Sequence, residues 1–497
     1  MISIYYKIKF GQSLKKVIVN VFISLNMIIV LGTSCKKIVQ VDAPYTSISD
    51  ENVFKEDNNA IAVLTGIFTQ MSQAGTMTGN SSINLYAGLS ADELVLYNSN
   101  PLPNYVSYYT NSLLALSPAQ NYGSELWSPL YSYIYQCNAA IEGLNGSTSL
   151  TASVKKQLLG EAKFLRAFFY FYLVNLYGDV PLALSADYKV NGSLARSSTP
   201  AVYQQIIIDL NDAKELLSSD YLNGNLKNYP SSLLAERVRP NKWAAIALLA
   251  RVQLYAGNWS DAESSASDLI ENNTMYDTVA LNDVFLKNSR EAIWQLQPVR
   301  GGSNTEEAKT FILSPDLPNG YDRPVYLSSQ LLNSFELNDQ RKVAGNWIDS
   351  CTLLGTTYFF PFKYKNIEAT VTEYFMVLRL GEQYLIRSEA RANLGNINGG
   401  ASDLNVIRAR AGLSPTTAND QNSLMSAILH ENQVELFTEW ANRWFDLKRT
   451  GKVDAVMNIV TPMKSNGAVH WQSYQQIYPI LFSDLKKNQS LKQNLGY

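Results

Sequence analysis

Two segments far apart in the chain share one helical-hairpin pattern. The first ends a helical run at 254–259 (LYAGNW), and small residues then recur at helical spacing at Ala262 and Ala266. The second repeats this ending at 394–397 (LGNI), within the segment 390–404. Glycine ends a helix because it adopts the left-handed conformation at little cost, and small residues allow two helices to approach closely. Each segment therefore predicts a pair of packed helices.

The spacing of the two hairpins excludes a simple solenoid. Gly257 and Gly395 are 138 residues apart, whereas a tandem tetratricopeptide array would repeat every ~34 residues. Further helices are predicted by apolar periodicity and by the glycine and proline residues that end it. The predicted helices span 53–71, 127–144, 153–177, 201–217, 241–256, 373–394, 401–411 and 423–450. The sequence therefore predicts an all-α fold built from tetratricopeptide-like helical pairs.

Two stretches interrupt the helical pattern. Residues 74–124 are rich in Gly, Ser, Asn, Pro and Tyr, and residues 275–372 combine alternating apolar residues with Gly and Pro. Such composition predicts loops with a few short strands, and long irregular segments are uncommon unless they are functional. We therefore expect residues 51–497 to form a single domain. Its helical framework would carry a large irregular, loop-rich face at about 74–124 and 275–372.

The N-terminus has the layout of a secretory signal peptide over residues 1–34. Four lysines and no acidic residue precede an apolar run at 17–31, which is shorter than the roughly 17–25 residues of a membrane span. The segment 31–35 (LGTSC) is similar to a bacterial lipobox, which implies cleavage before Cys35 and lipidation of that residue. An ordinary signal peptide with an incidental cysteine is the alternative. Residues 35–50 are then expected to form a lipidated polar tether, so the membrane is contacted through the lipid anchor only.

Charge and composition exclude several classes of function. Lys plus Arg number 41 against 43 Asp plus Glu, so no basic field exists to attract nucleic acid. With 2 His in the chain and Val434 where a zincin motif needs its second His, no histidine-based metal site is expected. No phosphate-binding glycine loop or Gly-x-Ser-x-Gly elbow is present. We expect no cofactor, whereas a metal held by loop carboxylates would leave no spacing signature.

Two charged stripes are predicted on neighbouring C-terminal helices. The acidic stripe is Glu431, Glu435 and Glu439, and the basic stripe is Arg379, Arg387 and Arg391. Like charges four residues apart repel each other and favour nearby cations, so we expect an Arg–Glu network that clamps the two helices together. The alternative is that two of the glutamates form the carboxylate pair of a glycoside hydrolase, set about 5–10 Å apart. Catalytic carboxylates more often project from loops or strand ends than from a regular helix stripe.

The 30 tyrosines of the chain indicate where a ligand would bind. The candidate ligand-binding residues are Tyr86, Asp92, Tyr97, Asn98, Tyr105 and Tyr108 in the first irregular stretch and Tyr321 and Tyr326 in the second. Such mixtures suit a sugar, whose ring has an apolar C–H face to stack and a rim of hydroxyls to hydrogen-bond. The alternative is that these tyrosines only pack beneath long loops, because most buried aromatic residues belong to the core.

Several segments together resemble one known family. They are the lipobox at 31–35, EAKFLRA at 161–167, YGDVPL at 177–182, LGEQYLIRSEA at 380–390, RWFDLKR at 443–449 after Glu439, and QNLGY at 493–497. These segments follow the order found in the SusD/RagB family of outer-membrane nutrient-binding lipoproteins. The chain departs from the family pattern at Lys36-Lys37-Ile38, which lacks the acidic cluster often linked to surface export, and in residues 74–124, which lack the tryptophans that stack sugar in some relatives. Leu495 replaces a more usual proline.

The resemblance implies a SusD-like fold without catalytic activity, lipid-anchored in the outer membrane and exposed at the cell surface. It also implies a partner, a SusC-like TonB-dependent outer-membrane channel to which captured oligosaccharides are passed. The expected function is therefore a surface-anchored binding lipoprotein for glycan uptake. The alternatives are a peptide-binding member of the same family, a secreted lipoprotein glycoside hydrolase, and a helical scaffold that binds no small ligand.

Overall fold

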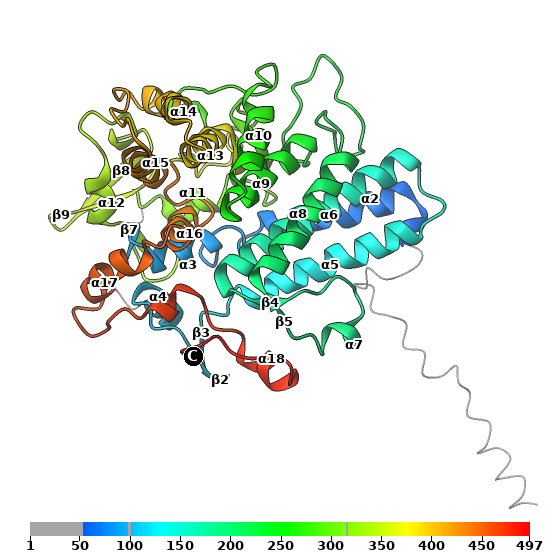
Figure 1. The fold of residues 1–497 in the computed structure, drawn as a ribbon, viewed down its shortest axis with the longest axis horizontal. Coiled ribbons are helices and arrows are strands. Elements are labelled where there is room, and N and C mark those ends of the chain that lie inside the picture. The colour runs from blue at the N-terminus through cyan, green and yellow to red at the C-terminus, as the bar shows by residue number, and fades with distance from the viewer. Residues whose placement is uncertain (1–52, 98–100, 315–316) are drawn as a thin grey trace, which may run out of the picture. The chain divides into compact units, whose positions relative to one another are not determined.

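The computed structural model describes residues 53–97, 101–314 and 317–497 (Figure 1). The predicted signal peptide, the tether with Cys35, and Asn98 lie outside the described residues. Within those residues, no helix combines the length and the hydropathy that crossing a bilayer requires.

The first half of the framework is a layer of long helices. It comprises α2 (Asp57–Ser72), α5 (Trp127–Gly146), α6 (Ala152–Tyr177) and α8 (Thr199–Leu216), which follow the short turn η1 (Val53–Lys55). Helix α6 packs against α2, α5 and α8, which lie beside it in Figure 1. Its segment 164–174 is buried on every face, as its apolar sequence predicts. Gly178, with φ +71°, ends the helix.

The two predicted hairpins form the second half of the framework. They are α9 (Lys242–Tyr255) with α10 (Trp259–Ile270), and α13 (Leu380–Asn393) with α14 (Ile397–Arg410). Gly257 and Gly395 both have positive φ, +77° and +82°, at the turns. A Cβ atom added at Gly400 would lie 2.9 Å from the Ser388 carbonyl oxygen, so α13 and α14 approach backbone to backbone.

The hairpins stack on each other although about 110 residues separate them. Helix α10 packs on α13, and α15 (Gln421–Glu435) packs on both α13 and α14. Small side chains at the junction, among them Ala250, Ala262 and Ala390, are fully buried. The all-α fold of tetratricopeptide-like pairs is confirmed.

The strands form antiparallel pairs among the described residues, and no larger sheet occurs there. The pairs are β1 (Leu94–Leu96) with β7 (Val325–Leu327), β2 (Leu114–Ser117) with β3 (Gln120–Tyr122), β4 (Val180–Pro181) with β5 (Arg196–Ser197), β6 (Ala292–Leu296) with β10 (Phe375–Arg379), and β8 (Ile348–Leu353) with β9 (Thr356–Pro361). Further helices lie before, between and after these strands. They are α3 (Ile83–Ser90), α4 (Pro103–Tyr109), α7 (Tyr188–Asn191), η2 (Leu281–Asp283), α11 (Glu306–Phe311), α12 (Ser329–Ser334), η3 (Gln340–Lys342), α17 (Val453–Lys464), η4 (Ser473–Gln476) and α18 (Phe482–Lys487).

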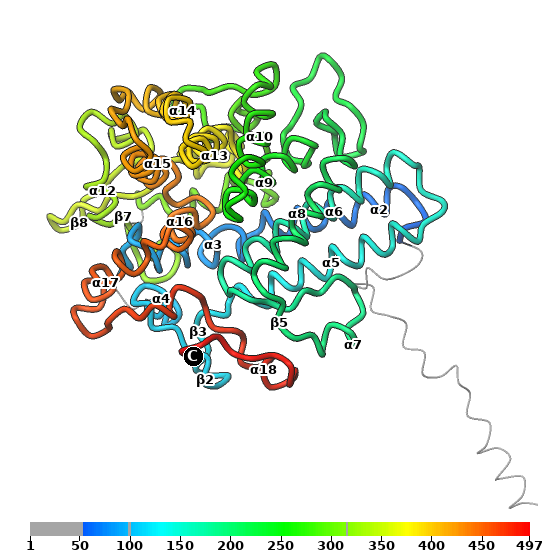
Figure 2. Tube along the Cα trace, viewed as in Figure 1, coloured from blue at the N-terminus to red at the C-terminus, as the bar shows by residue number. Residues whose placement is uncertain are grey.

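The first irregular stretch contains more regular structure than its composition predicts. Helices α3 and α4 lie within 74–124, and Figure 2 traces the chain through both of them. The Ser82 side chain caps α3 by accepting a hydrogen bond from the Leu85 N–H, and Pro103 occupies the first turn of α4. Both residues are ordinary signals for the start of a helix.

The predicted continuous helix over 423–450 is wrong. Helix α15 ends at Glu435 and α16 (Asn442–Arg449) begins only after a turn in which Thr438, Trp440 and Ala441 have positive φ. The Trp440 N–H donates to Asn84 Oδ1 at 2.5 Å, and the Thr438 N–H donates to Glu93 Oε1 at 3.3 Å. Contacts with distant residues thus replace the helical hydrogen bonds that local periodicity favours.

Candidate functional site

The two irregular stretches meet in the folded protein at one strand pair. Strand β1 runs antiparallel to β7, with Val95 opposite Tyr326. The Tyr97 N–H then donates to the Pro324 carbonyl oxygen at 2.7 Å. Residues more than 220 positions apart in the chain are therefore held at one place, as expected if the two stretches share one function.

Three tyrosines from three segments form a cluster there, named here the tyrosine surface: Tyr97, Tyr326 and Tyr358. Tyr358 lies on β9, which packs on β7. Its ring centroid is 5.9 Å from that of Tyr97 and 5.1 Å from that of Tyr326, and both pairs meet edge to face at 81°. All three residues are half-buried, so each presents part of its ring to solvent. Burial, and then the proximity of the Tyr358 hydroxyl, raise the pKa of Tyr326.

Further tyrosines border this surface. Burial and then the nearby Tyr326 hydroxyl raise the pKa of Tyr109, on α4, to about 12. Tyr321, on the loop before β7, is 62% exposed. The pKa of Tyr105 is raised to about 12 by burial and then by Tyr321 and Asp322. The region therefore combines phenol groups with charged neighbours: Asp322 is exposed next to Tyr321, and Lys464 Nζ lies 4.9 Å from the centroid of the Tyr109 ring.

Three of the predicted ligand-binding tyrosines lie beneath the surface instead of on it. Tyr86, Tyr105 and Tyr108 are 2%, 2% and 0% exposed, and the rings of Tyr86 and Tyr108 stack at 4.3 Å. Their hydroxyls are engaged within the protein. The Tyr105 hydroxyl donates to the Asn80 carbonyl oxygen at 2.6 Å, and the Tyr108 hydroxyl donates to Glu125 Oε2 at 2.8 Å. In this conformation they fix α4 against α3, so their direct contact with a ligand, as predicted, does not fit the structure.

Asp92 also has a supporting position. It is 4% exposed and accepts two hydrogen bonds from the Arg443 guanidinium, at 2.7 and 2.6 Å. Its carbonyl oxygen accepts a hydrogen bond from the Ser328 hydroxyl. Burial raises the pKa of the adjacent Glu93 to about 8. This acidic pair therefore anchors the start of β1 to α16 and to the end of β7, and does not face a ligand.

The predicted charge network exists, but its pairing differs from the prediction. Arg379 contacts Glu435 at 2.6 Å and Glu439 at 2.8 Å. Glu431, in contrast, pairs with Arg341 at 2.6 Å, a residue contributed by the second irregular stretch. Burial alone would raise the pKa of Glu435, but the surrounding arginines hold it well below its usual range.

Arg387 and Arg391 do not reach the acidic stripe at all. Both pair with Asp403 on α14, at 2.7 and 2.9 Å, because their positions on α13 face the hairpin partner. The side chains of Glu431 and Glu435 are 0% exposed. Because both carboxylates are buried and ion-paired, they link elements of the fold. In this conformation they are not accessible to a substrate, as the carboxylate pair of a glycoside hydrolase would have to be.

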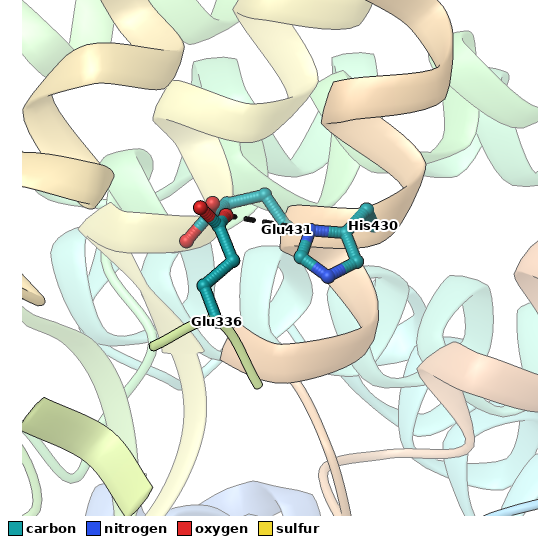
Figure 3. A group of neighbouring side chains, drawn as sticks. All are labelled: Glu336, His430 and Glu431. Carbon is teal, nitrogen blue, oxygen red and sulfur yellow. Dashed lines mark ion pairs between the residues drawn. The ribbon is translucent and has the colours of Figure 1, made fainter. Parts of the chain in front are cut away.

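Figure 3 shows the group in the described residues whose geometry could suit a metal ion: Glu336, His430 and Glu431. Arginine already fills the cationic role there. Arg408 contacts Glu336 at 2.6 Å and Glu431 at 3.3 Å, and its guanidinium lowers the pKa of Glu336. His430 Nε2 lies 2.7 Å from the Ser334 carbonyl oxygen. A metal ion would have to displace these contacts, so the group fits an ion-pair network better than a metal centre.

The sequence analysis did not select Tyr358 as a site residue. The segment TTYFFPFKY at 356–364 contains the signal, since aromatic residues are dense in it, but alternation along β9 decides which ring joins the surface.

The two remaining cysteines, Cys137 and Cys351, are both free, and Cys137 is buried in α5.

The fold consists of stacked helical hairpins with an irregular face, on which loops from distant parts of the chain bring aromatic residues together. This arrangement defines a class of helical-hairpin proteins with a loop-built face. Two family models match this chain. One, described as "Starch-binding associating with outer membrane", covers residues 47–254, and the other, described as "SusD family", covers residues 356–497. The chain belongs to the SusD/RagB family, a carbohydrate-binding family associated with the outer membrane.

Individual relatives agree with this assignment over most of their length. The chain is 23% identical to SusD-like protein P25 of Formosa agariphila, over 84% of this chain and 87% of that protein. A SusD superfamily protein from Bacteroides vulgatus has a similar structure, with a TM-score of 0.71 at 18% identity, covering 89% of this chain and 100% of that one. A laminarin-binding SusD-like protein gives a TM-score of 0.67 at 22% identity, covering 89% and 100%.

Proposed function

We propose that this protein is a surface-anchored lipoprotein that captures oligosaccharides on the tyrosine surface and passes them to a TonB-dependent outer-membrane channel. The observation that carries the proposal is the meeting of Tyr97, Tyr326 and Tyr358 at the β1–β7 pair. The two irregular stretches contribute these rings from separate segments, so a ligand bound there would contact both.

The geometry of the tyrosine surface suits a sugar chain. Edge-to-face packing at 81° sets each ring of a pair nearly perpendicular to the other, so a bent oligosaccharide can lay its C–H faces on more than one plane. Phenol hydroxyls both donate and accept hydrogen bonds and are neutral at physiological pH, and burial moves the pKa of Tyr326 further above that range. A cluster of phenol groups of this kind suits glycans, and a SusD-like structural relative binds laminarin.

Anchoring rests on the N-terminus, and transfer rests on the opposite roles of the helical framework and the loops. Lipidation of Cys35 would hold the protein at the outer membrane through the tether 35–50. We propose that the helical side of the protein docks on the channel, which leaves the irregular stretches free to hold the ligand.

Affinity gels containing single soluble polysaccharides, with laminarin among them, test the capture step. Tyr97→Ala combined with Tyr358→Ala should weaken the retardation of the mature protein by about tenfold, because each stacked ring contributes roughly 0.5–1.5 kcal/mol beyond its buried area. Phe359→Ala is the matched control, because alternation directs this residue to the opposite face of β9 from Tyr358. Equal retardation of the double variant and the control would contradict the proposal.

The same samples separate capture from catalysis and from peptide binding. A binding protein retards in the gel and releases no reducing ends from the polysaccharide. Release of reducing ends at enzyme-like rates would support the glycoside hydrolase alternative. Retention on immobilised peptides, with no retardation in any glycan gel, would support the peptide-binding alternative.

A further inference from the structure

A cavity lies between α5, α7 and α18. It is separate from the tyrosine surface and shares no residue with it. Its volume is about 350 Å³, which falls within the ~300–1,000 Å³ typical of small-molecule sites. Figures 1 and 2 show α7 and α18 beside the strand pair β4–β5, below the long helix α5. No sequence motif predicted this cavity.

Aromatic rings form much of its wall. Trp127 and Tyr131, one helical turn apart on α5, have ring centroids 4.9 Å apart. Their polar ends are directed into the protein: Trp127 Nε1 donates to Asp484 Oδ2 at 2.9 Å, and the Tyr131 hydroxyl donates to the Pro181 carbonyl oxygen at 2.8 Å. These bonds fix both rings, so the wall is formed before any ligand arrives.

Two further tyrosines that line the cavity are open to solvent. Tyr135, on α5, is 41% exposed, and Tyr188, at the start of α7, is 75% exposed. Exposing so much of a large ring to water is unfavourable. A ligand with an apolar face that covers the ring would remove this cost.

One polar group of the lining lacks a hydrogen-bond partner. The Oδ1 atom of Asn191 is buried without one, whereas the Nδ2 atom of the same amide donates to the Ser185 carbonyl oxygen at 2.6 Å. That bond fixes which way the amide faces, and buried acceptors of this kind are normally satisfied. The exposed ammonium of Lys487 and the carboxylate of Asp484 also line the cavity and balance each other in charge.

We infer that this cavity is a second saccharide subsite, which holds about one or two sugar units of a neutral glycan. The combination of apolar ring walls, a few amide side chains in the lining and balanced charge matches a sugar ring better than an ionic or wholly apolar ligand. The inference rests on the proposed capture of glycans and deepens it. A polymer that engages both the cavity and the tyrosine surface binds more tightly than either site allows, because the second contact is intramolecular.

The test uses the mature protein and whichever polysaccharides of the affinity-gel panel retard it. The cavity variant is Tyr135→Ala with Tyr188→Ala, both at exposed positions, and the control is Leu234→Ala, a residue 74% exposed outside both sites. Loss of two stacked rings should weaken retardation by about threefold to tenfold. Combining the cavity variant with Tyr97→Ala and Tyr358→Ala should abolish retardation.

The outcomes distinguish the two proposals. If the cavity variant migrates like the Leu234→Ala control while the tyrosine-surface variant does not, the cavity inference is overturned and the capture proposal stands. If only the cavity variant loses retardation, the cavity binds glycan and the tyrosine surface does not. Absence of retardation of the wild-type protein by every polysaccharide would overturn both.

Discussion

The buried ion pair between Arg251 and Glu382 should be a main joint between the two helical hairpins. Arg251 lies on α9 and Glu382 on α13, and two guanidinium nitrogens contact the two carboxylate oxygens at 2.5 and 2.6 Å. Their side chains are 2% and 7% exposed, and Arg251 also donates to the Tyr172 hydroxyl at 3.1 Å on α6. One side chain therefore connects three helices of the framework.

Removing one partner leaves the other charge buried without compensation. Arg251→Met or Glu382→Leu should each lower the free energy of unfolding by about 3–5 kcal/mol. With an unfolding entropy of roughly 2.1 cal/mol/K per residue, a chain of 497 residues has about 1 kcal/mol/K. Each single variant should therefore unfold about 3–5 °C below the wild-type protein. The double variant should cost less than the sum of the two, because it leaves neither charge unpaired.

Differential scanning calorimetry and urea titration of the mature protein measure these shifts. Arg391→Met is the matched control, because Arg391 also joins helices, through Glu263 and Asp403, but its side chain is 21% exposed. That variant should lose about 1 kcal/mol or less. Strictly additive losses in the double variant, or an Arg251→Met loss no larger than that of the control, would refute the reasoning.

Three further changes test other parts of the structure. Burial raises the pKa of Glu307 from 4.5 to about 8. Its contribution to stability is therefore complete below about pH 4.5 and is lost as the pH rises through 8, so urea titration should show Glu307→Gln gaining on wild type from pH 5 to pH 8. An advantage independent of pH would contradict this. Asn494→Ala should lower the melting temperature by about 1–3 °C, because it leaves the Tyr177 and Tyr478 carbonyl oxygens without its amide; an unchanged melting temperature would contradict that role. Cys35→Ala should stop incorporation of labelled fatty acid and release the protein from the membrane fraction, whereas retention there would contradict lipid anchoring.

The helical framework was predictable because its signals are local. A left-handed glycine ends each hairpin's first helix, and the apolar run of α6 matches a helix buried on every side. In both cases a window of about 15 residues contains all the information that the backbone needs. The SusD-like pairing of helices follows from these local units.

The course of the chain around the site was not predictable in the same way. The break between α15 and α16 depends on Asn84 and Glu93, which lie about 350 residues earlier and meet the turn only in the folded state. Helical periodicity continues through 423–450 in the sequence, so no local signal marks the turn. The break is therefore a tertiary effect that single-sequence patterns do not record.

The candidate site was found by composition, but its individual residues were not. Tyrosine density selects the right stretches, yet it cannot distinguish Tyr97, whose ring reaches solvent, from Tyr108, which is fully buried. That distinction depends on the β1–β7 pairing and on the packing of α4 against α3. Tyr358 joins the cluster from a third segment for the same reason.

The last residues of the chain have a consequence for when folding can finish. Asn494, three positions from the C-terminus and 3% exposed, donates to the Tyr177 carbonyl oxygen at the end of α6, more than 300 residues earlier. The two hairpins likewise pack on each other across about 110 residues of chain, so the contacts between α10 and α13 also close a large loop. The end of α6 therefore gains its last hydrogen-bond partner only when the segment around Asn494 docks, so this contact forms late in folding.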